Sequence, residues 1–172
     1  MKHSSIRILL AFAAKYDYKL DRLDVKTTFL NDDLDEEIYM AQPLGFKAAG
    51  KEKLVDKLQN SLYELKQAPR QWYKRFDKFM MGCGYTRSLF DPCLYFHKQQ
   101  SGEYIYLLLY VDDMLIASKN KSSIDKLKLQ LSSEFEMKDL REAKRILDIK
   151  IKRDRVKGKV SLTQKAYLQK VL

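Results

Sequence analysis

The chain has 172 residues, of which 45% are hydrophobic and 33% are charged, so it is long and apolar enough to bury a core of its own. No linker, repeat or low-complexity tract is evident, and the longest apolar run, at 104–111, is far shorter than the roughly 20 residues of a membrane-spanning helix. The net charge of +10 is uneven, because residues 119–172 hold 16 Lys and Arg against 7 Asp and Glu, or +9. Such asymmetry suits a polyanion such as nucleic acid, although a solvated lysine-rich surface would give the same count. We expect no membrane contact.

The start of the chain predicts an amphipathic helix. A basic start followed by the apolar segment 8–14 also resembles a short signal peptide, but seven residues is roughly the lower limit for such a segment. The helix is favoured because Ile6, Leu9, Leu10 and Ala13 recur at helical spacing.

Two further helices are predicted in the middle of the chain. Pro69 suits the first turn of a helix because its missing N–H has no partner there, and this helix should run from about 69 to 81. The other should begin with Ser122 or Ser123 as N-cap and run to about Glu136. The predicted apolar faces are Trp72, Phe76, Phe79 and Met80 in the first helix and Ile124, Leu127, Leu131 and Phe135 in the second.

Strand-like segments occupy the remaining apolar stretches. Residues 93–97 and 104–111 are rich in aromatic and aliphatic residues and should pair. The second of them should turn near a pair of aspartates and continue into 115–117 as a hairpin. A late hairpin is predicted from about 146 to 162. Because helices and strands mix without regular alternation, the predicted fold class is α+β.

The stretch "YVDDMLIAS", residues 110–118, places Asp112 and Asp113 side by side between two apolar segments. A structural turn would explain the pair, because Asp tolerates positive φ and bonds its own backbone. Two carboxylates lodged against a core, however, repel each other unless they share a cation. A further carboxylate is expected from Asp24, which lies in a strand-like segment, rather than from the acidic run at 32–37.

The two cysteines and two histidines are too few for a disulfide framework or for a zinc or histidine-built metal site. This usage favours a reducing compartment. If the protein holds a metal ion, carboxylates are the expected ligands.

Four blocks follow one another at compatible spacing: "LDVKTTFLNDDLDEEIYMAQPLGF" (23–46), "SLYELKQAPRQWYKRFDKFM" (61–80), "DPCLYFHK" (91–98) and "YLLLYVDDMLIAS" (106–118). Together they resemble the reverse transcriptase of copia-type LTR retrotransposons, over nearly the whole chain. The resemblance implies a palm-type antiparallel sheet packed on helices, within a single partial domain over 1–172. Palm and partial fingers would span about 1–145, and a primer-grip-like hairpin with the start of a thumb would span about 146–172.

The same resemblance implies RNA-directed DNA synthesis by two-metal nucleotidyl transfer to a primer 3′-hydroxyl. Asp24, Asp112 and Asp113 would be the catalytic residues, and with Val25 they would hold two Mg²⁺ ions, for which Mn²⁺ could substitute. The implied partners are a primed RNA or DNA template and deoxynucleoside triphosphates. In the parent element, ribonuclease H and integrase domains would complete the polyprotein, and the family expectation for location is the cytoplasm or the nucleus.

Three further residues are assigned to substrate binding by the resemblance. Phe29 would lie under the sugar and exclude a ribose 2′-OH, Gln67 would contact the incoming nucleotide, and Tyr110 matches the aromatic of the hairpin motif. The residue types alone leave a core aromatic, a polar residue near a helix start and a cross-strand packing residue as alternatives.

The chain departs from the family pattern in its length and its glycines. It begins inside the family's domain and ends at the start of the thumb, so the N-terminal fingers strands are expected to be missing. Only six glycines are present, against about twelve at an average of ~7%. The family usually has glycine where this chain has Asp32, Glu64, Arg141 and Asp148.

Each of these glycine replacements can arise by one G-to-A transition, which suggests a mutated copy of an element. A catalytically inactive remnant that binds nucleic acid through its basic C-terminal third is therefore the alternative function. An unrelated α+β binding domain whose Asp-Asp turn is only structural is the third reading.

Overall fold

The computed structural model describes residues 2–26, 36–47, 50–51, 53–59, 68–147, 149–164 and 168–169. The chain forms two compact units, of which one holds residues 1–26 and 79–172 and the other holds residues 27–78. In chain order the elements are α1 (His3–Lys15), β1 (Lys19–Val25), β2 (Tyr39–Ala41), β3 (Val55–Lys57), α2 (Ala68–Gly82), β4 (Thr86–Arg87), β5 (Leu94–Lys98), β6 (Tyr104–Tyr110), β7 (Asp113–Ser118), α3 (Lys121–Glu134), β8 (Met137–Glu142), β9 (Arg145–Ile146), β10 (Ile149–Asp154) and β11 (Lys159–Thr163).

The larger unit is built on a six-stranded sheet with the order β4-β5-β6-β7-β1-β8. All neighbouring strands in it are antiparallel, and helices pack on it, so the α+β prediction is confirmed. The hairpins predicted from 93–97, 104–111 and 115–117 appear as β5, β6 and β7. The late hairpin appears as β10 and β11, joined through Gly158 at φ 57°, and β9 pairs with β10 to complete a second sheet.

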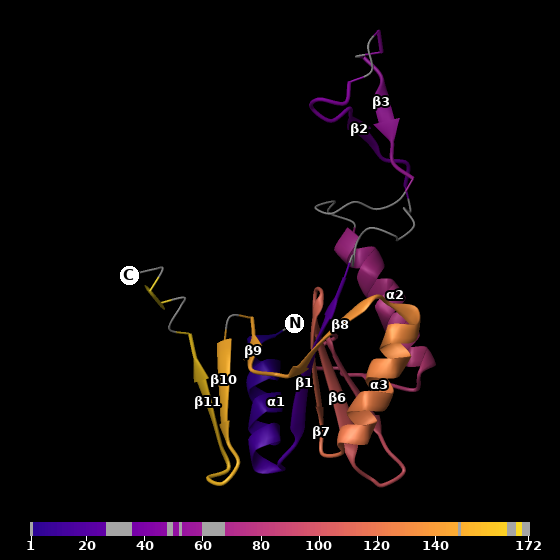
Figure 1. The fold of residues 1–172 in the computed structure, drawn as a ribbon. Coiled ribbons are helices and arrows are strands. Elements are labelled where there is room, and N and C mark those ends of the chain that lie inside the picture. Colours follow the sequence, from indigo (N-terminus) through magenta and orange to yellow (C-terminus); the bar gives the residue numbers. More distant parts are fainter. Residues whose placement is uncertain are drawn as a thin grey trace. The chain divides into compact units, whose positions relative to one another are not determined.

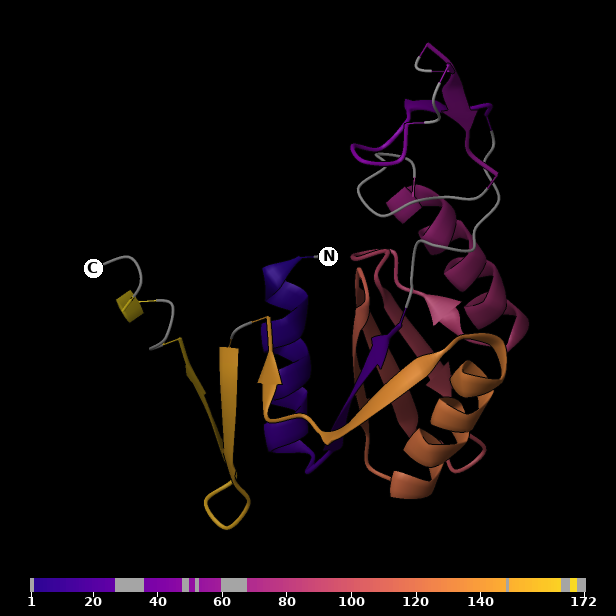
Figure 2. The same ribbon diagram turned by 45° about the horizontal axis from the view of Figure 1, so that its top comes forward.

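Helix α1 lies between the six-stranded sheet and the three-stranded sheet (Figures 1 and 2). All four residues of its predicted apolar stripe are buried. They join one core with side chains of both sheets, namely Leu20, Leu108, Leu115, Ala117, Ala143, Ile146 and Ile151. The apolar stripe of α1 therefore faces the core that the two sheets share.

The opposite face of the six-stranded sheet is covered by α3 and by the C-terminal end of α2 (Figure 1). The predicted stripe of α3 is buried throughout, and Phe135 packs edge-to-face on Phe79 with ring centroids 5.2 Å apart. The predicted N-cap of α3 was wrong. Asn120 caps the helix, because its Oδ1 accepts the N–H of Ser122 at 3.0 Å, and the Ser122 hydroxyl donates to the same oxygen.

A buried ion cluster ties β1 to α3 and β8 on this second face. Asp21 is 4% exposed and accepts hydrogen bonds from Lys121 at 2.5 Å and from Lys128. Lys128 is itself buried and also donates to Asp139 at 2.8 Å. A carboxylate buried in this way is tolerated because both of its charged partners are present, and removing one would leave an uncompensated charge.

The smaller unit holds a two-stranded antiparallel sheet of β2 and β3, with Tyr39 opposite Lys57. Both Tyr39 and Lys57 bond the carboxylate of Glu37. Within the described ranges of both units, no helix combines the length and the hydrophobicity that crossing a membrane requires.

Asp91 fixes the start of α1 although it belongs to the loop before β5. Its Oδ2 accepts the N–H of Lys2 at 2.8 Å and the hydroxyl of Ser5 at 2.5 Å, and its Oδ1 accepts the N–H of Cys93 at 3.0 Å. The carboxylate thus lies at the positive end of the helix dipole, which favours the charged form. Burial acts to raise the pKa of Asp91, but these hydrogen bonds together hold it below its usual value.

An Asp91→Asn substitution should therefore lower stability at neutral pH by about 1–3 kcal/mol, the size of a lost charge-assisted bond. Because the pKa of Asp91 is lower in the folded state, its contribution to stability is complete at pH values above its unfolded-state pKa of about 3.9. That contribution is lost as the pH falls through its folded-state pKa. The gap in Tm between wild type and variant should narrow below about pH 4. Thermal unfolding followed by circular dichroism would measure it, and Asp56→Asn, at an exposed position on β3, is the control. A gap that is constant with pH would contradict the assignment.

Arg141 occupies a backbone conformation that glycine adopts more readily. Its φ is +60°, and it lies at a bulge where β8 has one residue more than β1, since Asp21 pairs with Glu142 and Leu23 with Asp139. The bulge is held by the Arg141 N–H, which donates to Asp139 at 2.8 Å. This is one of the four positions at which the resemblance leads us to expect glycine, and a φ of +60° is a conformation that glycine adopts more readily.

We expect Arg141→Gly to stabilise the protein by about 1 kcal/mol, because a side chain in the left-handed region costs roughly 1–2 kcal/mol. For a chain of this size the gain is about 2–4 °C in Tm. Arg141→Ala removes the same charge but keeps Cβ, so its Tm should not rise. Equal Tm values for the two variants would show that the backbone at Arg141 is not strained.

Candidate active site at the turn between β6 and β7

The turn between β6 and β7 consists of two residues, Val111 and Asp112, because Tyr110 and Asp113 are paired as the last rung of the hairpin. Val111 has φ +57°. The positive φ thus falls on a β-branched residue and not on either aspartate, so the tolerance of Asp for this geometry does not explain the Asp-Asp pair. A β-branched residue in this region is an outlier, and such strain is typical of functional sites.

Strand β1 brings Asp24 to this turn. Asp24 is the direct cross-strand partner of Asp113, and the N–H of Val25 donates to the carbonyl of Asp112 at 2.9 Å. The structure therefore brings the three predicted aspartates together at one end of β1 and β7. Like charges directly opposite each other in a sheet are destabilising.

The electrostatics of Asp113 reflect this crowding. Its side chain is 8% exposed and accepts a hydrogen bond from Nε of Arg22 at 2.6 Å. Burial raises its pKa, the Arg22 guanidinium acts in the opposite direction, and the charges of Asp24 and Asp112 raise it further, so that the net shift is upward. One arginine thus compensates only part of the negative charge at the turn.

The donor set fits a hard divalent cation in its chemistry. Carboxylate and carbonyl oxygens are the ligands that Mg²⁺ prefers, and a cation near Asp24 and Asp112 would relieve the repulsion that raises the pKa of Asp113. In the described part of the chain, no three His, Cys, Asp or Glu side chains already converge as a metal site. Asp113 is turned towards Arg22 instead.

The other predicted site residues have different outcomes. Tyr110 ends β6 next to the turn and is 40% exposed. Phe29 and Gln67 lie outside the described residues, as do Asp32, Glu64 and Asp148.

Two residues at the turn were missed from the sequence. Arg22 lies two residues before Asp24, so the two side chains lie on the same face of β1. The alternation of side chains along a strand could therefore have predicted that Arg22 lies near the aspartates. The positive φ of Val111 could not have been predicted from its residue type, because valine disfavours this conformation.

Comparison with known proteins agrees with these features. A family model described as "Reverse transcriptase (RNA-dependent DNA polymerase)" matches residues 1–172. The chain is 53% identical over 172 residues to the retrovirus-related Pol polyprotein from transposon TNT 1-94 of Nicotiana tabacum, and 36% identical over 172 residues to that from transposon RE1 of Arabidopsis thaliana. Each match covers 100% of this chain but only 13% and 12% of the relatives.

Among solved structures, apo telomerase from Candida tropicalis, truncated from its C-terminal domain, matches with a TM-score of 0.45 and 11% identity, over 94% of this chain and 40% of that chain. The family model and the Pol polyproteins carry the assignment, because both match along the full length of the chain. This chain therefore belongs to the reverse transcriptase (RNA-dependent DNA polymerase) family, in the branch of copia-type retrotransposon Pol polyproteins.

Proposed function

We propose that this chain supplies the catalytic centre for RNA-directed DNA synthesis within a larger Pol polyprotein. The observation that carries the proposal is the adjacency of Asp24 on β1 to Asp112 and Asp113 at the β6–β7 turn. In a chain of this family, three carboxylates at one strand end are best explained by a shared cation, because a purely structural turn would gain nothing from their repulsion.

Asp24, Asp112, Asp113 and the carbonyl of Val25 are the groups that would hold Mg²⁺ or Mn²⁺. When bound, two such ions activate the primer 3′-hydroxyl and stabilise the leaving pyrophosphate. Arg22 is a positioning residue in this proposal, because its bond to Asp113 fixes the rotamer of that carboxylate. Asp24 and Asp112 are both half-buried, so they can be reached from solvent at the strand end.

Substrate contacts would come from residues around the same turn. Tyr110 is exposed beside it, and Phe29 and Gln67 are proposed to contact the sugar and the incoming nucleotide. The proposed partners are a primed template, deoxynucleoside triphosphates, and the ribonuclease H and integrase parts of the polyprotein.

The basic C-terminal third is proposed to contact the phosphates of the template and primer. In β10, Ile151 is buried against α1, whereas Lys150 and Lys152 are exposed on the other face of the strand. Arg153 has a structural role instead, because it donates to the carbonyls of Ala13 and Tyr18 and pairs with Asp17. Lysine contacts of this kind bind nucleic acid without reading its sequence.

Binding of nucleic acid without catalysis is the second candidate. The positive φ of Arg141 favours it, because the resemblance leads us to expect glycine at this position and a replaced glycine is consistent with a mutated copy of an element. This candidate predicts that affinity falls steeply with salt and does not depend on the aspartates.

Asp112→Asn should lower the rate of primer extension on an oligo(dT)-primed RNA template with Mg²⁺ or Mn²⁺ by at least about 100-fold. The reason is that stabilisation of the transition state by a metal ion is worth several kcal/mol. Asp125→Asn, an exposed carboxylate on α3, is the matched control and should retain activity. Equal extension by wild type and Asp112→Asn would contradict the assignment of Asp112. Template binding without extension in both wild type and Asp125→Asn would favour the second candidate.

A further inference from the structure

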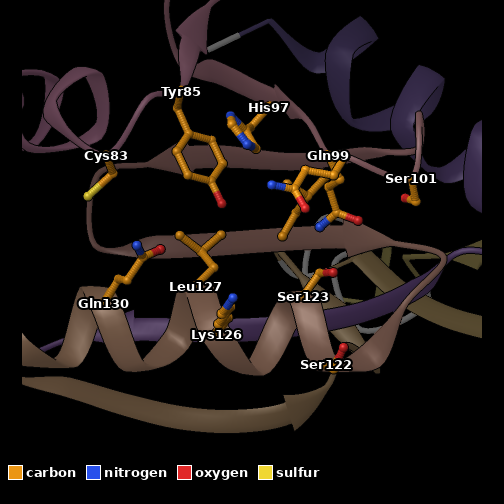
Figure 3. A pocket seen from close by; sticks show the side chains of 12 residues that line it. Cys83, Tyr85, His97, Gln99, Ser101, Ser122, Ser123, Lys126, Leu127 and Gln130 are labelled. Carbon is orange, nitrogen blue, oxygen red and sulfur yellow. The ribbon is translucent and has the colours of Figure 1, made fainter.

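A cavity of about 610 Å³ lies on the face of the sheet that α3 covers. Its walls come from α3 on one side and from the β4, β5 and β6 region on the other (Figure 3). Ile105 and Leu127, both fully buried, form its apolar floor. A volume of this size is typical of sites for small organic ligands.

This cavity is separate from the aspartates. Asp113 shares its face of β7 with Leu115 and Ala117, which pack towards α1, whereas Ile105 faces the side covered by α3. The cavity also opens near the start of β6, and the turn with Asp112 follows the end of that strand, roughly 20 Å away along seven residues.

Tyr85 is the most buried polar residue that lines the cavity. The tyrosine is only 7% exposed, and its hydroxyl points into the space between the strands and α3 (Figure 3). Among the hydrogen bonds of the described residues, none involves this hydroxyl, although the ring packs on His97 with centroids 5.3 Å apart. A buried hydroxyl without a protein partner costs about 1–3 kcal/mol unless water or a ligand in the cavity bonds it.

The charge around the cavity favours an anionic group at one end. No acidic side chain lines the cavity, and Lys126 is the one lysine among the residues that line it, with no arginine. In the part of the chain that the structure describes, Lys126 forms no ion pair. Ser123 lies beside it in the first turn of the 14-residue helix α3, whereas the N–H and the hydroxyl of Ser122 already donate to Asn120. The positive end of the helix dipole favours a phosphate.

The remaining polar groups suit a flat heterocycle. Gln99 and Gln130 carry amides that both donate and accept, as the edge of a nucleobase does. Nδ1 of His97 bonds the carbonyl of Gly84 at 2.8 Å, so in the neutral ring Nδ1 donates and Nε2 is left as an acceptor. From Ser122 to Gln130 the helix rises about 12 Å, so a phosphate and a base can occupy opposite ends.

We propose that this cavity is a binding site for a nucleoside monophosphate, with its phosphate at Lys126 and the first turn of α3 and its base near Tyr85 and the glutamines. Burial also raises the pKa of Tyr85, so its hydroxyl stays protonated and donates to the ligand. Because the glutamine amides can turn either way, the geometry selects the class of ligand and not a particular base.

Isothermal titration calorimetry tests this site, with the full chain titrated by adenosine, guanosine, cytidine and uridine monophosphate in turn. The buffer contains a chelator, so that metal-dependent binding at the aspartates does not contribute to the signal. We expect saturable binding of at least one nucleotide. Lys126→Gln and Tyr85→Phe should each weaken its affinity about tenfold, because the loss of one hydrogen bond worth about 1.4 kcal/mol changes Kd by that factor. Lys98→Gln, which changes an exposed lysine on β5, should leave the affinity unchanged.

The stability of Tyr85→Phe is a second readout. If the hydroxyl lacks a partner, the variant should melt at the same temperature as wild type or higher, so weaker nucleotide binding cannot be attributed to unfolding. The proposal is overturned if none of the four nucleotides binds, or if both pocket variants bind as tightly as wild type. Inorganic phosphate that binds as tightly as the nucleotide would show an anion site only and would also overturn it.

Discussion

The antiparallel pairing of β1 with β7 is the constraint on which the other features depend. It places Asp24 opposite Asp113, and it places Leu20 and Ala117 together under α1. Because side chains alternate along a strand, a slip of one residue would carry Asp24 and Leu20 to the face covered by α3 and would place Asp21 under α1. The core side chains of β1 therefore fix the position of the candidate metal ligands.

The site is assembled at a cost in stability. Val111 holds a positive φ that suits glycine, and Asp113 is a buried carboxylate beside two others with a single arginine as partner. The six-stranded sheet tolerates both because they lie at its end, beyond the rungs that carry the apolar core. Unfavourable local features that persist in this way are a common property of catalytic centres.

The sequence predicted elements with a clear period and missed features that arise from contacts between distant residues. The stripes of α1 and α3 and the hairpins of β5 to β7 follow from local patterns. By contrast, the cap formed by Asp91 joins residues 86 and 89 positions apart, and the cluster around Asp21 joins residues up to 107 apart. Asn120 was missed as N-cap because Ser122 and Ser123, two and three residues later, are equally good candidates by residue type.

The division of the larger unit into two chain segments also constrains the order of folding. Strand β1 can complete its pairing only after β7 has been synthesised, since Arg22 and Asp113 are 91 positions apart. The smaller unit is contiguous and lies between these two strands in the sequence, so its residues belong to the loop that must close. Until then, β1 has both of its hydrogen-bonding edges unpaired, and a nascent chain stalled within residues 27–78 would be prone to aggregate through that strand.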